Sequence, residues 1–222
     1  MIPTFQPPST THSIPAMDHI VFATNNAHKL SEVRQMLDGI VEVLSLADID
    51  CHDDIPETAN TLEGNALQKA QWVFTRYGYD CFADDTGLEV DCLNGAPGVF
   101  SARYAGEGHN DNANKRKLLA DMKDAANRQA QFRTVVALIE AKPREDNNDV
   151  DSETHCFEGI VRGQLLEKER GAAGFGYDPL FVPDGHSMTF AQMTAEQKNA
   201  ISHRAMAVAK LVDYLKNKQE NK

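Results

Sequence analysis

Two adjacent carboxylates, Asp84 and Asp85, lie in the run Ala83-Asp-Asp-Thr-Gly87, where an apolar stretch meets a glycine. Neighbouring carboxylates repel each other unless a cation or hydrogen-bond donors offset their charge. Mg²⁺ prefers oxygen ligands and commonly takes one or two carboxylates together with substrate phosphates, and α/β folds place ligands at strand ends. These residues are equally compatible with a magnesium site and with a solvated turn in which Asp84 accepts backbone N–H groups.

A second polar segment, Thr24-Asn-Asn-Ala-His-Lys29, joins an apolar run to a stretch with helical spacing. A helix that starts directly after a strand offers free backbone N–H groups and a partial positive charge, and both suit a phosphate group. Lys29 would add a full positive charge. The segment matches neither standard glycine-rich phosphate motif, and by itself it is more typical of an ordinary asparagine-rich turn with a solvated lysine.

A third segment, Gly174-Phe-Gly-Tyr-Asp178-Pro, combines glycines with two aromatic rings and a carboxylate. Glycines let the backbone approach a ligand closely, and aromatic rings offer a stacking face for a base. Asp178 is a candidate to accept hydrogen bonds from donors on a base edge. A tight turn whose aromatic rings fill the core explains the same residues equally well.

A fourth segment, Lys198-Asn-Ala-Ile-Ser-His-Arg204, places three cationic or titratable side chains next to an apolar helix. Such groups can hold a phosphate or donate to the acceptors of a purine. Lys198, His203 and Arg204 would not share a face of one unbroken helix. We therefore expect a break near residues 199–202, with Ser202 capping the final helix; the alternative is a solvated basic face.

The elements that position these segments follow from the hydrophobic spacing along the chain. We expect strands at 19–23, 41–46, 80–84, 88–92, 131–141 and 155–161, and helices at 28–38, 61–77, 111–123 and from about 201 to 218. Gly87 is expected to break the strand that ends at Asp84. Residues 94–108 and 171–183 are predicted to be glycine-rich loops, and 142–153 a solvated hairpin loop. This alternation predicts an α/β fold with a mixed sheet.

The composition limits the classes of function. The chain has 222 residues and a net charge of −11, with 33 acidic and 22 basic residues. Such a charge disfavours a nucleic acid partner, and no apolar run is long enough to predict a membrane partner. The four cysteines are scattered and are expected to be reduced thiols. Residues 1–17 are expected to form a disordered tail, which leaves 18–222 as the folded domain.

Taken in order, these segments resemble the inosine triphosphate pyrophosphatase family, and within it the bacterial dITP/XTP pyrophosphatases. The resemblance rests on seven ordered anchors: Thr24–Lys29, Glu57-Thr58, Asn65-Ala66 with Lys69-Ala70, Ala83–Leu88, Gly95–Tyr104, Gly174–Pro179 and Lys198–Arg204. It implies a single elongated domain with a central mixed β-sheet flanked by helices, and two lobes around a nucleotide-binding cleft. It further implies a homodimer, and the reduced thiols predict a cytoplasmic protein.

The resemblance also implies a reaction, in which ITP, dITP or XTP is hydrolysed to the nucleoside monophosphate and pyrophosphate. Asp85 would be the general base and a Mg²⁺ ligand, with Glu57 as a second ligand. The implied substrate-binding residues are Thr24, Asn25, Asn26, Ala27, His28, Lys29, Thr86, Phe175, Gly176, Tyr177, Asp178, Lys198, His203 and Arg204. Arg204, supported by His203, would donate to the 6-oxo group of the base. The alternatives are a septum-inhibitor-like pyrophosphatase acting on dTTP or UTP, and a nucleotide-binding module without catalytic activity.

Overall fold

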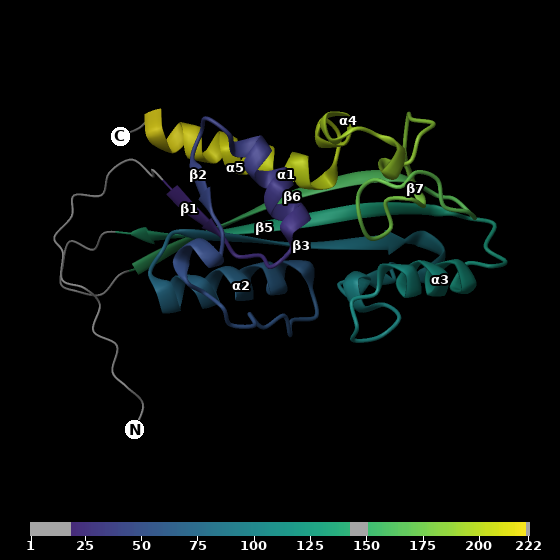
Figure 1. The fold of residues 1–222 in the computed structure, drawn as a ribbon, viewed down its shortest axis with the longest axis horizontal. Coiled ribbons are helices and arrows are strands. Elements are labelled where there is room, and N and C mark those ends of the chain that lie inside the picture. Colours follow the sequence, from purple (N-terminus) through teal and green to yellow (C-terminus); the bar gives the residue numbers. More distant parts are fainter. Residues whose placement is uncertain (1–18, 143–150, 221–222) are drawn as a thin grey trace, which may run out of the picture.

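In the described part of the chain, seven strands form one mixed sheet that runs the length of the molecule (Figure 1). The computed structural model describes residues 19–142 and 151–220, so the expected tail at 1–17 and most of the expected loop at 142–153 lie outside the described residues. The strands are β1 (His19–Phe22), β2 (Glu42–Leu44), β3 (Cys81–Val90), β4 (Pro97–Gly98), β5 (Gln129–Lys142), β6 (Asp151–Leu165) and β7 (Phe181–Pro183). Their order is β2-β1-β3-β5-β6-β7, with β4 paired to β3.

The pairing confirms the expected mixture of strand directions. β1 is parallel to both β2 and β3, whereas β3, β5, β6 and β7 follow one another as antiparallel neighbours. β5 and β6 pair from Lys142 and Asp151 at one end to Gln129 and Gln164 at the other. This long hairpin lies at the centre of the sheet. Both of its strands extend beyond the residues expected from the sequence.

The first three helices begin at polar capping residues. The helices are α1 (Ala27–Leu37), α2 (Leu62–Tyr77), α3 (Asp111–Asp121), α4 (Ala195–Asn199) and α5 (His203–Glu220). The Asn26 side chain accepts hydrogen bonds from the N–H groups of His28 and Lys29 at the start of α1. Thr61 and Asn110 cap α2 and α3 in the same way.

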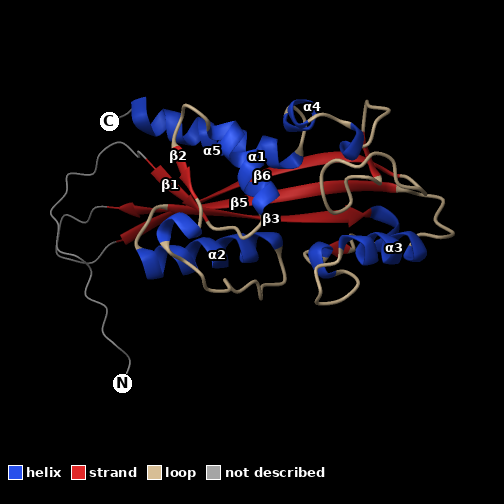
Figure 2. Ribbon diagram, in the orientation of Figure 1, coloured by secondary structure: helices blue, strands red, loops and turns tan. Residues whose placement is uncertain are grey.

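The helices cover the two faces of the sheet, with α2 on one side and α1 and α5 on the other (Figure 2). Because side chains alternate along a strand, Phe82 of β3 packs with residues of α1 and α5. Cys81 and Ala83 of the same strand pack instead with Ala70 and Val73 of α2. At the far end of the sheet, α3 shares a core with Tyr177 and neighbouring residues of the glycine-rich loop.

The expected break at Gly87 is wrong, because β3 is one continuous strand from Cys81 to Val90. Gly87 pairs with Arg133 of β5 in regular register. A Cβ atom at Gly87 would lie 2.6 Å from the carbonyl oxygen of Gly98. The lack of a side chain at Gly87 therefore allows β4 to pack close against β3. The segment expected to be a loop, 94–108, contains this short strand.

The expected interruption before the last helix is confirmed. α4 ends at Asn199 and α5 begins at His203. Ser202 Oγ accepts a hydrogen bond of 3.1 Å from the N–H of Ala205, as a capping residue does. Lys198 and Arg204 therefore belong to two helices, which frees them from the spacing of a single helix.

Candidate functional site

A cleft of about 400 Å³ lies beside the edge of β3 and gathers nearly all the residues that the sequence singles out. Every predicted site residue lines it except Ala27 and His28. His28 contacts a residue that lines the cleft, because its ring stacks on that of Phe175 with a centroid distance of 5.7 Å. The four polar segments, which are far apart in sequence, thus meet in one place.

The cleft exists because β1 is short. β1 ends at Phe22 and pairs with Cys81 and Phe82, whereas β4 pairs with Leu88 and Glu89. Within the described residues, no strand flanks the intervening part of β3 on this side. Side chains satisfy its backbone there: Lys69 Nζ donates to the carbonyl oxygen of Asp84 at 2.8 Å, and the N–H of Thr86 donates to Asp85 Oδ1 at 2.9 Å.

Asp84 points to the face of the sheet covered by α1 and α5. Lys29 Nζ donates to its Oδ1 at 2.9 Å, and Arg204 Nε donates to its Oδ2 at 3.1 Å. Burial opposes the charge on Asp84, but Lys29, Arg204 and Lys69 outweigh burial and hold its pKa well below the usual range. Asp84 is absent from the residues that line the cleft. It is therefore an anionic anchor for two cationic side chains.

Asp85 points to the opposite face, towards α2, and lines the cleft. Asn65 Nδ2 donates to its Oδ2 at 3.0 Å. Burial raises the pKa of Asp85, although Lys69, Lys29 and the Asn65 amide act in the other direction. The two aspartates are thus separated by the sheet, and a solvated turn does not describe either of them.

Glu57 and Lys69 lie next to Asp85 on the α2 side. Lys69 Nζ donates to Glu57 Oε1 at 2.7 Å. Lys69 is buried, which would lower its pKa, but Glu57, Asp85 and Asp84 together raise it. Its ammonium group therefore stays charged between the carboxylates. Asn65 and Lys69 belong to the anchors of the family resemblance, but no role in the site was expected of either.

The donor set here fits Mg²⁺ only if the substrate completes it. Among the residues that the structure describes, no group of three His, Cys, Asp or Glu side chains is arranged to hold a metal ion. Asp85 and Glu57 nevertheless both line the same cleft, and burial is what raises the pKa of Asp85. Two carboxylates plus substrate phosphates and water form a usual Mg²⁺ environment.

The start of α1 supplies the second wall of the cleft. Asn26 Oδ1 accepts from the N–H groups of His28 and Lys29 at 3.0 and 3.1 Å, and so occupies donors that a free helix start would offer to a ligand. Lys29 lines the cleft while bonded to Asp84. Burial lowers the pKa of Lys29, and Asp84 partly restores it. The positive charge of this wall thus comes chiefly from a lysine side chain.

The third wall combines Phe175 with two cations. Lys198 Nζ lies 4.9 Å from the centroid of the Phe175 ring, and Arg204 Cζ lies 5.6 Å from it. Asp178 Oδ2 accepts two hydrogen bonds, one of 2.9 Å from Lys198 Nζ and one of 3.0 Å from the N–H of Phe175. An aromatic face bordered by cationic donors suits a flat, oxygen-rich ring.

His203 is buried beside this wall, and its ring stacks on Phe132 with a centroid distance of 4.7 Å and an interplanar angle of 15°. Its Nδ1 atom is buried without a hydrogen-bond partner within the described residues. Burial, Arg204 and Lys198 hold the pKa of His203 well below its ordinary value. The neutral ring therefore contributes a hydrogen-bonding edge and no positive charge.

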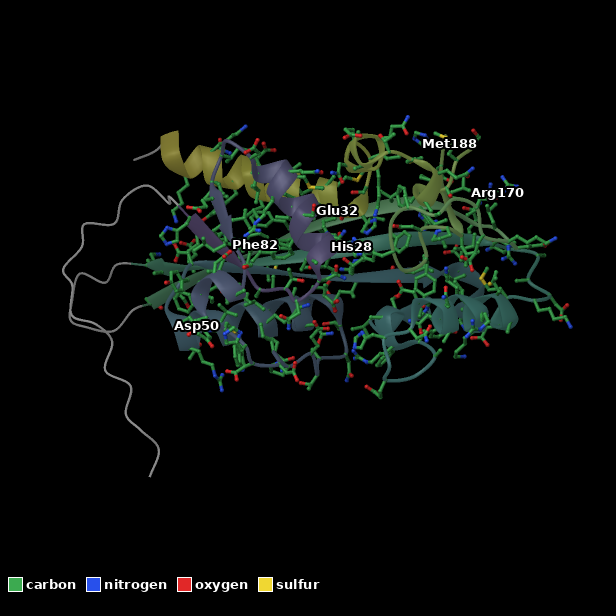
Figure 3. All side chains as sticks on the ribbon, viewed as in Figure 1. His28, Glu32, Asp50, Phe82, Arg170 and Met188 are labelled. Atoms are coloured by element: carbon green, nitrogen blue, oxygen red, sulfur yellow. The ribbon has the colours of Figure 1, made fainter. Side chains whose placement is uncertain are left out.

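Glu32 is another residue of the site that could not be singled out from the sequence patterns used above. It lies on α1, which also carries His28 (Figure 3). Its carboxylate accepts from Lys198 Nζ at 2.9 Å and also from Arg204 Nη1. Burial opposes its charge, but the two cations lower the pKa of Glu32. Its position three residues after Lys29 places both on one helix face, a signal that the sequence already contained.

Comparison with known proteins agrees with the resemblance inferred from the sequence. The family model of the Ham1 family matches residues 20–214. The dITP/XTP pyrophosphatase of Flavobacterium psychrophilum is 53% identical over 89% of this chain and 99% of its own length. That of Porphyromonas gingivalis is 54% identical over 90% of this chain and 98% of its own.

A solved structure shares the fold. The Ham1 protein of Staphylococcus aureus superposes with a TM-score of 0.77 and 36% sequence identity, covering 90% of this chain and 99% of that protein. The expected α/β architecture of a single elongated domain is confirmed by this match. Within the described residues, no helix combines the length and the apolar character that crossing a membrane requires.

Proposed function

Because this chain belongs to the Ham1 family, we propose that it hydrolyses the deaminated purine nucleoside triphosphates ITP, dITP and XTP to the monophosphate and pyrophosphate. The observation that carries the proposal is the cleft itself, in which lysines and carboxylates form one side and an aromatic ring bordered by cations forms the other. Relatives about half identical over nearly the whole chain have the name dITP/XTP pyrophosphatase. Both supports point to a nucleotide with a charged tail and a 6-oxo base.

In the proposed reaction a water oxygen attacks the α-phosphorus, the bond from that phosphorus to the pyrophosphate oxygen breaks, and the water proton passes to Asp85. Burial raises the pKa of Asp85, which makes it a stronger base than an exposed carboxylate. Lys29 and Lys69 border the same cleft and would stabilise the negative charge of the departing pyrophosphate.

We propose Mg²⁺ as the cofactor, with Asp85 and Glu57 as its protein ligands. When bound, it would neutralise polyphosphate charge and orient the phosphates. Lys69 Nζ donates to Glu57 Oε1 at 2.7 Å, which keeps a positive charge beside the proposed ligands. Addition of EDTA is expected to abolish turnover, and added Mg²⁺ is expected to restore it.

At the base, we propose that Arg204 donates to the 6-oxo group. In the structure three of its N–H groups are directed to Asp84, Glu32 and Thr86. A guanidinium group has five N–H donors, so two are left for a ligand. The charge-assisted hydrogen bond to an oxygen would be lost with adenine, which has an amino group at that position.

The decisive experiment is a pyrophosphate-release assay with ATP, GTP, ITP, dITP, XTP and dTTP, each with and without Mg²⁺. The proposal requires the highest kcat/KM for ITP, dITP and XTP. A preference for dTTP would identify a pyrimidine-directed, septum-inhibitor-like enzyme. Nucleotide binding without any release of pyrophosphate would identify a non-catalytic binding module.

We further propose that the enzyme is a homodimer that acts in the cytoplasm. Its four cysteines are free thiols, as suits a reducing compartment. The homodimer is the association that the resemblance to the family implies. Sedimentation equilibrium at micromolar concentration tests the dimer, and a mass of 24.5 kDa would identify a monomer.

A further inference from the structure

The loop that carries Phe175 and Asp178 is fixed by a contact from a distant part of the chain. The N–H of Gly176 donates a hydrogen bond of 2.7 Å to Oδ2 of Asp111, the first residue of α3. Both residues line the cleft, although 65 positions separate them in sequence. The helix does not need this carboxylate as its cap, since Asn110 accepts from the N–H of Ala113 at 2.9 Å.

The loop requires such a restraint because its backbone is unusual. Gly174 and Gly176 have φ values of +74° and +60°, and glycine loses the most conformational freedom when it is ordered. Nothing lies within 4 Å of a Cβ placed on Gly176, so packing does not determine its conformation. The inner end of the loop is anchored separately, by the 2.9 Å hydrogen bond from Tyr177 Oη to the Ser101 carbonyl oxygen.

We propose that Asp111 is a positioning residue for base recognition, which holds Gly176 so that the adjacent Phe175 ring stays at the base end of the cleft. This inference rests on the proposed function, since it assigns that wall to the base. Lys29 and Asp85, on the phosphate side, are held by Asp84 and Asn65 instead. Loss of the Asp111 carboxylate therefore weakens binding of the base and leaves the pyrophosphate side unchanged.

The test uses Asp111→Ala in the full-length protein, with IMP and pyrophosphate as separate probes in calorimetric titrations. The Kd for IMP is expected to rise about fivefold to tenfold, the scale of one intramolecular hydrogen bond, and the Kd for pyrophosphate to stay the same. Asp111→Asn keeps an acceptor oxygen and is expected to restore most of the affinity. Asn110→Ala is the matched control, because it removes the cap of the same helix and leaves Gly176 untouched.

Hydrogen exchange of the ligand-free protein provides a second measurement that does not depend on the substrate. Amides of residues 174–177 are expected to exchange faster in Asp111→Ala and at the wild-type rate in Asn110→Ala. Unchanged exchange in Asp111→Ala would overturn the proposal, and so would faster exchange with an unchanged Kd for IMP. Failure of the wild-type protein to bind IMP would count against the proposed function, while the exchange comparison would still decide whether Asp111 holds the loop.

Discussion

Asp84 and Asp85 are adjacent in sequence but have different surroundings, because successive side chains of a strand point to opposite faces. Asp84 is bonded to Lys29 and Arg204, and its pKa is low. Asp85 accepts from an amide, and burial raises its pKa. A single strand thus supplies one permanently ionised anchor and one carboxylate suited to accept a proton.

We expect Asp85→Asn to fold normally and bind nucleotide but to lose nearly all turnover. The amide preserves the size of the side chain and removes both its basicity and its charge toward Mg²⁺. Each tenfold loss of rate corresponds to about 1.4 kcal/mol in the barrier. Steady-state kinetics at saturating Mg²⁺ give the measurement. Turnover above about a tenth of wild type would show that Asp85 is not the general base. Asp84→Asn is the comparison, and its main expected effect is lost stability, because two buried cations lose their partner.

Arg204→Lys is expected to lower kcat/KM for ITP about tenfold to a hundredfold, and for ATP by much less. An ammonium group cannot replace the planar fork that reaches Asp84, Glu32 and a base at once, and an unmade buried hydrogen bond costs about 1–3 kcal/mol. Both substrates are to be measured on both proteins. Equal losses for ITP and ATP would assign Arg204 to the phosphates or to folding.

Glu32→Gln is expected to lower the free energy of unfolding by roughly 2 to 4 kcal/mol at pH 7, because it breaks a buried ion-pair network. The pKa of Glu32 in the folded protein lies below its ordinary value of 4.5. The stabilisation is therefore complete above pH 4.5 and is lost as the pH falls through the lower folded-state value. Urea denaturation at several pH values should show that the difference in free energy of unfolding between wild type and Glu32→Gln becomes smaller in acid. A difference that does not change with pH would contradict the ionic origin.

At the scale of elements, the approach of α5 to the sheet decides where His203 and Arg204 lie. A Cβ atom on Gly159 of β6 would lie 2.0 Å from the carbonyl oxygen of His203 and 2.7 Å from the backbone nitrogen of Ala207. These are backbone atoms, so the helix itself would have to shift. The absence of a side chain at Gly159 thus sets the position of the wall that is proposed to bind the base.

Gly159→Ala is therefore expected to destabilise the protein by about 1–3 kcal/mol, the usual cost of overpacking, and to reduce kcat/KM through displacement of α5. Thermal unfolding and steady-state kinetics measure the two effects. Gly108→Ala is the control, because nothing lies within 4 Å of its added Cβ. A variant at Gly159 that matched the control in both measurements would show that α5 tolerates the added methyl group.

Most elements could be predicted from the sequence, because caps such as Thr61 and the spacing of apolar residues are local signals. Most candidate site residues came instead from four polar segments and their order along the chain, which missed cleft residues such as Lys69 and Asp111. The error at Gly87 arose because the reason for that glycine is Gly98, a partner in another strand. The contact of Gly176 with Asp111 is equally hidden, since 65 positions separate the two. Glu32 differs from these, because helix periodicity alone could have placed it beside Lys29, although it was not singled out in the sequence analysis.

At the scale of the whole molecule, the cleft joins segments from both ends of the chain, from Thr24 to Arg204. A ligand bound there contacts elements from both faces of the sheet and should stabilise the folded state as a unit. The increase in the free energy of unfolding follows from mass action, and it is about 2.7 kcal/mol at a ligand concentration of 100 times Kd.

We expect ITP with Mg²⁺ at that concentration to raise the Tm of Asp85→Asn by about 5–10 °C, given about 2–4 °C per kcal/mol for a chain of this size. The inactive variant prevents hydrolysis during the scan. Scanning calorimetry with ITP, ATP and no nucleotide makes the comparison. An equal shift with ATP would show that the base contributes nothing to binding, and no shift with ITP would place the nucleotide elsewhere.

The short β1 strand also matters for association between copies of the chain. An uncovered strand edge is a template on which another chain can add a strand and begin to aggregate. Along β3, side chains of the site already occupy the exposed backbone groups. Lys69 Nζ donates to the carbonyl oxygen of Asp84, and the Asp85 carboxylate accepts from the N–H of Thr86. Ser101 Oγ takes the N–H of Leu88 further along. The side chains proposed for nucleotide chemistry therefore also protect solubility, and replacing Lys69 would unmask a strand edge as well as remove a charge.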